Sequence, residues 1–83
     1  MNLFVIVKAI SILGKDKLEK YCVDKEEGTF LDIKKILENY KKGNIDIYET
    51  IELINSCEPI ILNDKIIYPS YDKDIILEID DNL

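Results

Sequence analysis

The spacing of hydrophobic residues changes several times along the chain, and each change predicts a different element. Residues 3–10 are almost entirely apolar and rich in β-branched side chains, which is typical of a central strand. After a turn around Gly14, residues 17–23 alternate imperfectly and predict a second strand. The two strands therefore form a predicted hairpin, which the polar residues 24–28 bring to an end.

Helical spacing begins at Thr29. Thr29 with Asp32 resembles a capping box, and the helix that it opens is predicted to end at Gly43. A second, shorter helix is predicted from Asp46, with Glu49 as its capping partner, and it must stop before Pro59. The apolar stripes expected on these helices are Ile33, Ile36, Leu37 and Tyr40 on the first and Ile47, Ile51 and Ile54 on the second.

The last third of the chain predicts strands again. Residues 60–62 and 65–68 are mostly apolar and are separated by Asn63 and Asp64, two residues that tolerate the positive φ of a tight hairpin. Residues 75–79 alternate between apolar side chains and a mixed set, which predicts a final strand with one core face and one mostly wet face. This strand is expected to lie beside the first strand and parallel to it.

The order of these elements predicts an α+β fold in one domain, residues 1–83. We expect one mixed sheet, with the main helix and the second short helix packed on one face. A central parallel pair made by the first and last strands is the β-grasp, or ubiquitin-like, arrangement.

Side-chain alternation in that arrangement predicts a partner-binding surface. If Val5 and Val7 face the helices, then Phe4 and Ile6 on the first strand and Ile76 on the last face the other way. In a two-layer fold this other face has no helix over it, and the tail would continue it. The alternative is that a loop or a strand edge of the same chain covers the patch. The predicted partner-binding residues are Phe4, Ile6, Ile76, Asp80, Asp81, Asn82 and Leu83.

Composition narrows the possible partners. The net charge is −6 and the chain contains no arginine, which argues against nucleic acid and against anionic membrane surfaces. The apolar start has no basic leader, and Lys8 interrupts a run too short to span a bilayer, so the protein is expected to be cytoplasmic.

The residues offer little for catalysis or metal binding. Cys22 and Cys57 are too few for a disulfide framework and, without any histidine, too few for a typical zinc site. We expect both as free thiols, with a redox pair as the minor alternative. No histidine is present to act as a general base, and Asp72 with Asp74 lacks the rest of a calcium loop. The sequence therefore predicts no enzyme, no metal site and no cofactor.

Two long segments resemble a known family. "VKAISILGKDKLEKYCVDKEEGTFLDIKKILENY" is similar to the first half of the MoaD and ThiS sulfur carriers, and "ILNDKIIYPSYDKDIILEI" is similar to their second half. Asn63 stands at the asparagine of the family's hairpin and Asp74 at the aspartate before its last strand, whereas Lys73 stands where the family prefers glycine. The resemblance implies a β-grasp fold and protein partners such as activating enzymes or the large subunits of molybdopterin and thiazole (thiamine) synthases.

The chain departs from that family at its end. The carriers finish in Gly-Gly, whose carboxylate is adenylated and then receives sulfur in a narrow channel that only glycines can enter. Asp80 to Leu83 stand here instead, which leaves two explanations: a protein that lost the reaction, or a truncated chain. We therefore expect a carrier-derived module that binds another protein or associates with itself. The alternative is a structural or regulatory β-grasp subunit of a larger complex unrelated to sulfur transfer.

Overall fold

A computed structural model describes residues 5–11, 18–62 and 64–81 of the chain. In chain order the elements are β1 (Val5–Ser11), β2 (Leu18–Val23), α1 (Gly28–Lys41), α2 (Ile47–Asn55), β3 (Ile60–Leu62), β4 (Lys65–Pro69) and α3 (Lys73–Asp81). This content confirms the predicted α+β class. The two hairpins and the first two helices lie where the sequence predicts them.

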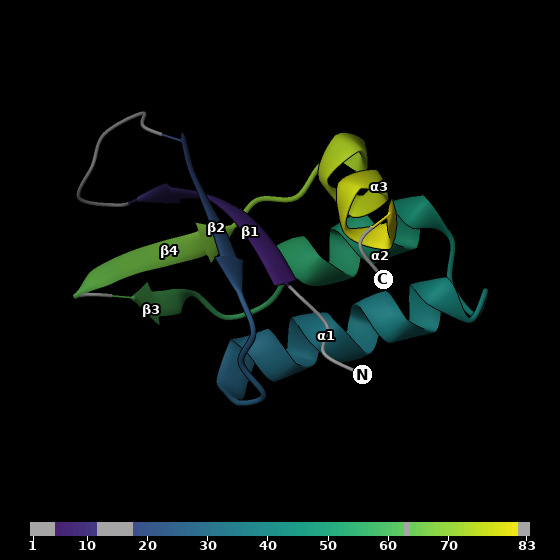
Figure 1. Ribbon diagram of the computed structural model, residues 1–83, viewed down its shortest axis with the longest axis horizontal. Helices are drawn as coiled ribbons and strands as arrows, with labels where there is room; N and C mark the ends of the chain where they lie inside the picture. The colour runs from purple at the N-terminus through teal and green to yellow at the C-terminus, as the bar shows by residue number, and fades with distance from the viewer. Residues whose placement is uncertain (1–4, 12–17, 63, 82–83) are drawn as a thin grey trace.

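The described strands form one sheet in the order β2-β1-β4-β3, and all of their pairings are antiparallel. β1 is a central strand, as predicted from its apolar composition. Its neighbours are β2, with Ile6 opposite Cys22, and β4, with Ala9 opposite Pro69. Figure 1 shows the helices grouped on the right of the view, while the β3–β4 hairpin extends away from them on the left.

The predicted last strand is wrong, because residues 73–81 form helix α3. Asp72 starts this helix: its carboxylate accepts a hydrogen bond of 3.0 Å from the Ile75 amide, and its backbone oxygen accepts one from the Ile76 amide. The described sheet is consequently antiparallel, not mixed, and the parallel pair on which the β-grasp expectation relied is absent from the described strands.

The charge on Asp72 supports this helix start. The Ile75 amide, and with it the Lys8 ammonium 3.3 Å away, lower the pKa of the Asp72 carboxyl. Because folding lowers this pKa, the ionised Asp72 carboxylate stabilises the folded protein at neutral pH. This stabilisation is lost as the pH falls through the pKa of the folded state.

The other two helix starts differ in how their caps are made. Asp46 accepts a hydrogen bond of 2.8 Å from the Glu49 amide, which confirms the predicted cap of α2. The capping box predicted at Thr29 is wrong, because α1 begins at Gly28 and its N-cap, Glu27, makes no side-chain capping bond. Gly43 follows the end of α1 with φ 80°, a left-handed conformation that glycine adopts without strain.

The core is one cluster of buried apolar side chains drawn from sheet and helices alike. Ile33 and Leu37 of α1, Ile54 of α2 and Ile76 of α3 are almost completely buried. Ile36, Tyr40, Ile47 and Ile51 pack against this cluster from partly exposed positions, so the predicted stripes of the first two helices are confirmed. The sheet and the three helices thus share a single interior.

Candidate functional site

The predicted open patch is not a surface in this fold. Ile6 is buried, with 4% of its side chain exposed, and Ile76 is completely buried. The reason is α3: it packs against β1 and α2, and its helical twist turns Ile76 inwards together with Ile75 and Ile79. The prediction that Ile6 and Ile76 form an exposed docking patch is therefore wrong. Phe4 lies outside the described residues.

Of the predicted tail residues, the structure describes two, Asp80 and Asp81. Asp80 is in the last turn of α3, half-buried, and its carboxylate accepts a hydrogen bond of 2.9 Å from Lys41 at the end of α1. Asp81 is exposed at the helix end, and Asn82 and Leu83 lie outside the described residues. Asp80 thus has an intramolecular role in joining α1 to α3. Its predicted part in partner binding stays a prediction.

Exposed apolar side chains gather instead on the β3–β4 hairpin. Ile61 and Ile66 lie directly opposite each other across the two strands, and Tyr68 is two residues beyond Ile66 on the same face. Their side chains are 70%, 38% and 50% exposed, respectively. We call Ile61, Ile66 and Tyr68 the hairpin surface.

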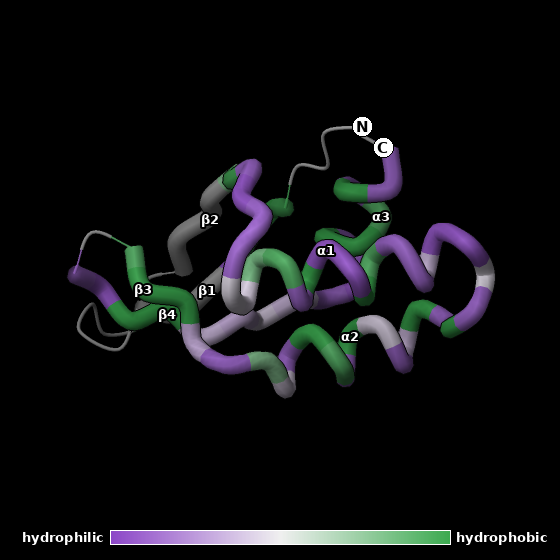
Figure 2. Tube along the Cα trace, turned by 90° about the horizontal axis from the view of Figure 1, so that it is seen from below, coloured by the Kyte–Doolittle hydropathy of each residue, from purple (hydrophilic) through white to green (hydrophobic). Residues whose placement is uncertain are grey.

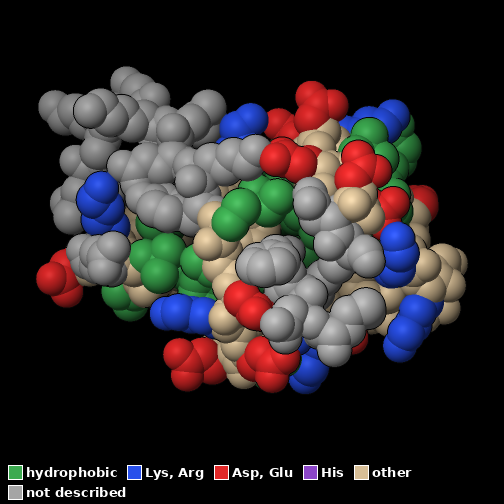
Figure 3. All heavy atoms as spheres, in the orientation of Figure 1, with side chains coloured by type: hydrophobic (Ala, Val, Ile, Leu, Met, Phe, Trp, Pro, Cys, Tyr) green, Lys and Arg blue, Asp and Glu red, His purple; other side chains and the backbone are tan. Residues whose placement is uncertain are grey.

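The hairpin surface exists because the helices cover only one face of these strands. Ile60 and Ile67, which alternate with Ile61 and Ile66, are buried in the core. In Figure 2 the tube is hydrophobic along β3 and along the part of β4 that pairs with it, and in Figure 3 hydrophobic side chains reach the surface over the region of this hairpin. A hairpin that is apolar on both faces but covered on one leaves the other available to a partner.

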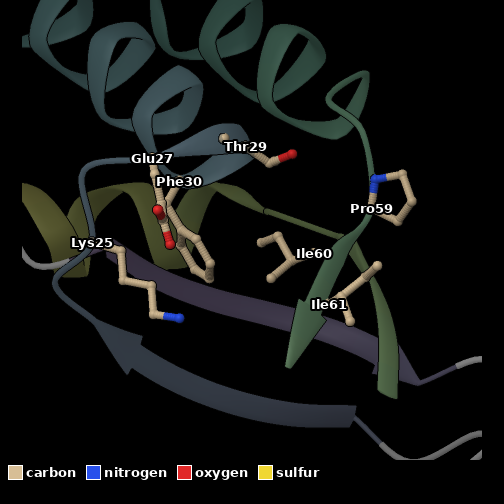
Figure 4. A pocket seen from close by; sticks show the side chains of 8 residues that line it. Lys25, Glu27, Thr29, Phe30, Pro59, Ile60 and Ile61 are labelled. Carbon is tan, nitrogen blue, oxygen red and sulfur yellow. The ribbon is translucent and has the colours of Figure 1, made fainter. Parts of the chain in front are cut away.

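A groove of about 420 Å³ lies beside the hairpin surface. One side is formed by Pro59, Ile60 and Ile61, and the other by the segment from Lys25 to the first turn of α1. Figure 4 shows Ile60 and Phe30 side by side at its floor, with Lys25 and Glu27 across from Pro59 and Ile61. We call this the β3-edge groove. Its complete lining is Lys25, Glu27, Gly28, Thr29, Phe30, Pro59, Ile60 and Ile61.

Two contacts hold the α1 side of this groove in place. The Lys34 ammonium donates a hydrogen bond to the Glu26 carboxylate, which lowers the pKa of Glu26 and raises the pKa of Lys34. The Lys25 ammonium lies 5.5 Å from the centre of the Phe30 ring, within range of a cation–π contact. Lys34 itself is buried, whereas Glu26 is exposed.

The described residues supply little for other chemistry. Within residues 5–11, 18–62 and 64–81, no group of three or more His, Cys, Asp or Glu side chains could hold a metal ion. Among the helices described, none is both long and apolar enough to cross a membrane. The features that remain for function are the hairpin surface and the β3-edge groove.

The two cysteines lie where the sequence predicts them and are free thiols. Cys22 is exposed on β2, and Cys57, just past α2, is partly buried, with its thiol donating to the Leu53 carbonyl oxygen at 3.4 Å. Burial raises the pKa of the Cys57 thiol.

Reaction with a thiol reagent at mildly alkaline pH is expected to be biphasic, with Cys22 modified several-fold faster than Cys57. The thiolate is the reacting species, and burial limits both access to Cys57 and its ionisation. Stopped-flow absorbance with an aromatic disulfide reagent measures both phases. Cys22→Ser should remove the fast phase and Cys57→Ser the slow one. A single uniform rate, or fewer than two reactive thiols without added oxidant, would contradict this.

Sequence reasoning missed the hairpin surface, although its residues are plain in the sequence. Both strands of the second hairpin carry consecutive isoleucines, Ile60–Ile61 and Ile66–Ile67, so neither shows the alternation that marks a wet face. That continuous pattern is the signal that could have found the surface. It indicates a strand that is apolar on both faces, and only one of those faces can meet the predicted helices.

Comparison with known proteins yields no relative. No family model matches the chain, and neither the curated proteins nor the solved structures contain a match.

Proposed function

We propose that the protein is a small protein-binding module whose docking site is the hairpin surface. The observation that carries this proposal is the cluster of three large apolar side chains on one sheet face, each more than a third exposed. Solvated apolar area of this kind gains free energy when a partner covers it. Isoleucine on a sheet and a half-exposed tyrosine also present rigid side chains, which lose little entropy on binding.

Both functional hypotheses drawn from the sequence require a protein partner, and protein binding is what we propose here. A carrier-derived module and a structural or regulatory subunit of a complex would each dock through an apolar surface. A more specific proposal is that the module has a β-grasp fold and is related to the sulfur carriers. The hairpin at residues 60–69 supports it, and helix α3 departs from the strand that it requires.

The docking site can be tested with two matched double variants. Ile61→Thr with Tyr68→Thr removes apolar area from the hairpin surface and places at both positions a β-branched residue that suits a strand. Tyr48→Ser with Leu53→Ser makes a comparable change on the exposed face of α2, where these side chains are 70% and 46% exposed. Both variants should fold, because all four side chains are exposed.

Partners are identified by placing a photo-crosslinking amino acid at position 68 or, as the control, at position 48, and expressing the protein in its native cell. We expect one or a few defined crosslinked proteins from position 68 and none of these from position 48. The purified partner should then bind the hairpin variant at least about tenfold more weakly than the α2 variant, the loss expected when roughly 1.4 kcal/mol of contact is removed. Equal binding of both variants would place the docking site elsewhere.

A further inference from the structure

We propose that the β3-edge groove takes an extended, basic segment of another protein, which pairs with β3 as an additional strand. The inference rests on the proposed function, because it names the kind of partner segment that a module docking at this hairpin would bind. It is carried by the position of the groove, the unpaired edge of β3 and the charge around it.

The groove follows the edge of the strand rather than a face of the sheet. β3 is the outermost strand beyond β4, so its other edge has no neighbour among the described strands. Ile60 and Ile61 both line the groove, yet consecutive strand residues point to opposite faces. A groove that both residues line therefore runs along the backbone edge of β3. The start of α1 lies across the groove from this edge (Figure 4).

The backbone at this edge has groups that an added strand can use. Leu62 pairs with Lys65 at the end of the two strands, and in an antiparallel ladder hydrogen-bonded and non-hydrogen-bonded pairs alternate. We infer that Leu62 and Lys65 form a hydrogen-bonded pair, the usual arrangement where a short hairpin closes, and this pairing would direct the N–H and C=O of Ile61 away from β4, on the groove side of the strand. An extended segment can bond to both groups and lay alternate side chains against Phe30 and Ile60 below or against the hairpin surface.

The charge around the edge favours a basic segment. Glu58 directly precedes the lining residue Pro59, and Asp64 follows β3 in the sequence, so carboxylates flank this strand at both ends. Glu27 lines the opposite side of the groove, and the one lysine of the lining, Lys25, lies over the Phe30 ring. A second copy of the chain would bring another net charge of −6 to the same place, so a Lys- or Arg-containing partner is the complementary occupant.

The test uses the full chain and a displayed library of random peptides of about seven residues, a usual strand length. Selected binders are expected to carry Lys or Arg at intervals, with apolar residues between them. N-methylation of one alternate set of backbone amides in a selected peptide should abolish binding. Methylation of the other set should leave binding nearly unchanged, because only one edge of an added strand faces β3.

A pair of charge-reversed variants localises the binding. Glu27→Lys with Glu58→Lys reverses two carboxylates beside the groove, whereas Glu38→Lys with Glu52→Lys makes the same change in net charge on exposed helix positions away from it. The first should lower affinity for the selected peptide about tenfold or more, and the control less than about threefold, as for charges outside direct contact.

Several results would overturn the inference. They are a library that yields no binder, binders without excess positive charge, binding that tolerates both sets of N-methyl groups, and equal effects of the two charge-reversed variants. Self-association in sedimentation that disappears with Glu27→Lys and Glu58→Lys would make a second copy the occupant and also overturn it. If binding depends on Ile61 and Tyr68 but not on Glu27 and Glu58, the proposed function stands and this inference fails alone.

Discussion

Ile76→Ala is expected to lower the free energy of unfolding by about 2 to 5 kcal/mol, whereas Leu77→Ala is expected to change it by less than about 1 kcal/mol. Ile76 is completely buried on the inner face of α3, so truncation leaves a cavity between this helix and its neighbours. Leu77 is the next residue of the helix and is 43% exposed. Alanine suits an exposed helical position, which offsets part of the lost contact.

This pair of variants separates a helix from a strand at residues 73–81. In the strand that the sequence pattern predicts, Leu77 shares the core face with Ile75 and Ile79, and Ile76 faces outwards, so the two effects would be reversed. Urea unfolding followed by circular dichroism measures both values, with equal slopes confirming that the two variants unfold in the same way. A larger loss for Leu77→Ala than for Ile76→Ala would contradict the helix.

Most of the local structure could be predicted because local chemistry fixes it. Asp46 stands where α2 must begin, and its carboxylate caps the helix as the spacing to Glu49 suggests. The apolar composition of residues 3–10 predicts a central strand, since only a strand covered on both sides needs apolar residues in succession, and β1 is central in the sheet. The second hairpin changes strands between Leu62 and Lys65, as predicted, and Asp64 has the positive φ expected there, 65°, while Asn63 lies outside the described residues.

The segment after Pro69 could not be settled by its pattern. Ile75, Leu77 and Ile79 alternate as in a strand, while Ile75, Ile76 and Ile79 have the spacing of a helix face, and nine residues are too few to separate the two periods. The outcome depends on contacts with distant residues. Asp72 meets Lys8 of β1, Asp80 meets Lys41 of α1, and neither pair is visible in a local pattern.

The incorrect prediction of a strand at residues 75–79 also made the predicted binding site incorrect. The pattern predicts Ile6 and Ile76 on an open sheet face because a β-grasp leaves that face bare, but here α3 packs against β1. The exposed large apolar side chains of the described strands lie instead on β3 and β4. Which face of a doubly apolar hairpin is left open depends on where every helix packs, and a pattern along one strand contains no such information.

The segment between β4 and α3 is held to α2 by one side chain, Asn55. Its amide group donates a hydrogen bond of 3.0 Å to the Tyr71 carbonyl oxygen, and its carbonyl group accepts one of 2.7 Å from the Tyr71 amide. An asparagine can satisfy both backbone groups of one residue because it carries a donor and an acceptor side by side. Tyr71 itself is buried, so these backbone groups have little access to water.

Asn55→Ala is therefore expected to lower the free energy of unfolding by about 1 to 3 kcal/mol, since two hydrogen bonds are lost and two backbone groups are left unpaired. Asn39→Ala is the matched control. Asn39 is an exposed asparagine of α1 whose side chain accepts one bond of 3.3 Å from Asn44, and its replacement should change stability by no more than about 0.5 kcal/mol. Urea unfolding gives both values, and amide hydrogen exchange should show faster exchange at Tyr71 in the Asn55 variant. Equal values for the two variants would mean that Asn55 does not fix this segment, and the placement of α3 would then have to come from its buried isoleucines alone.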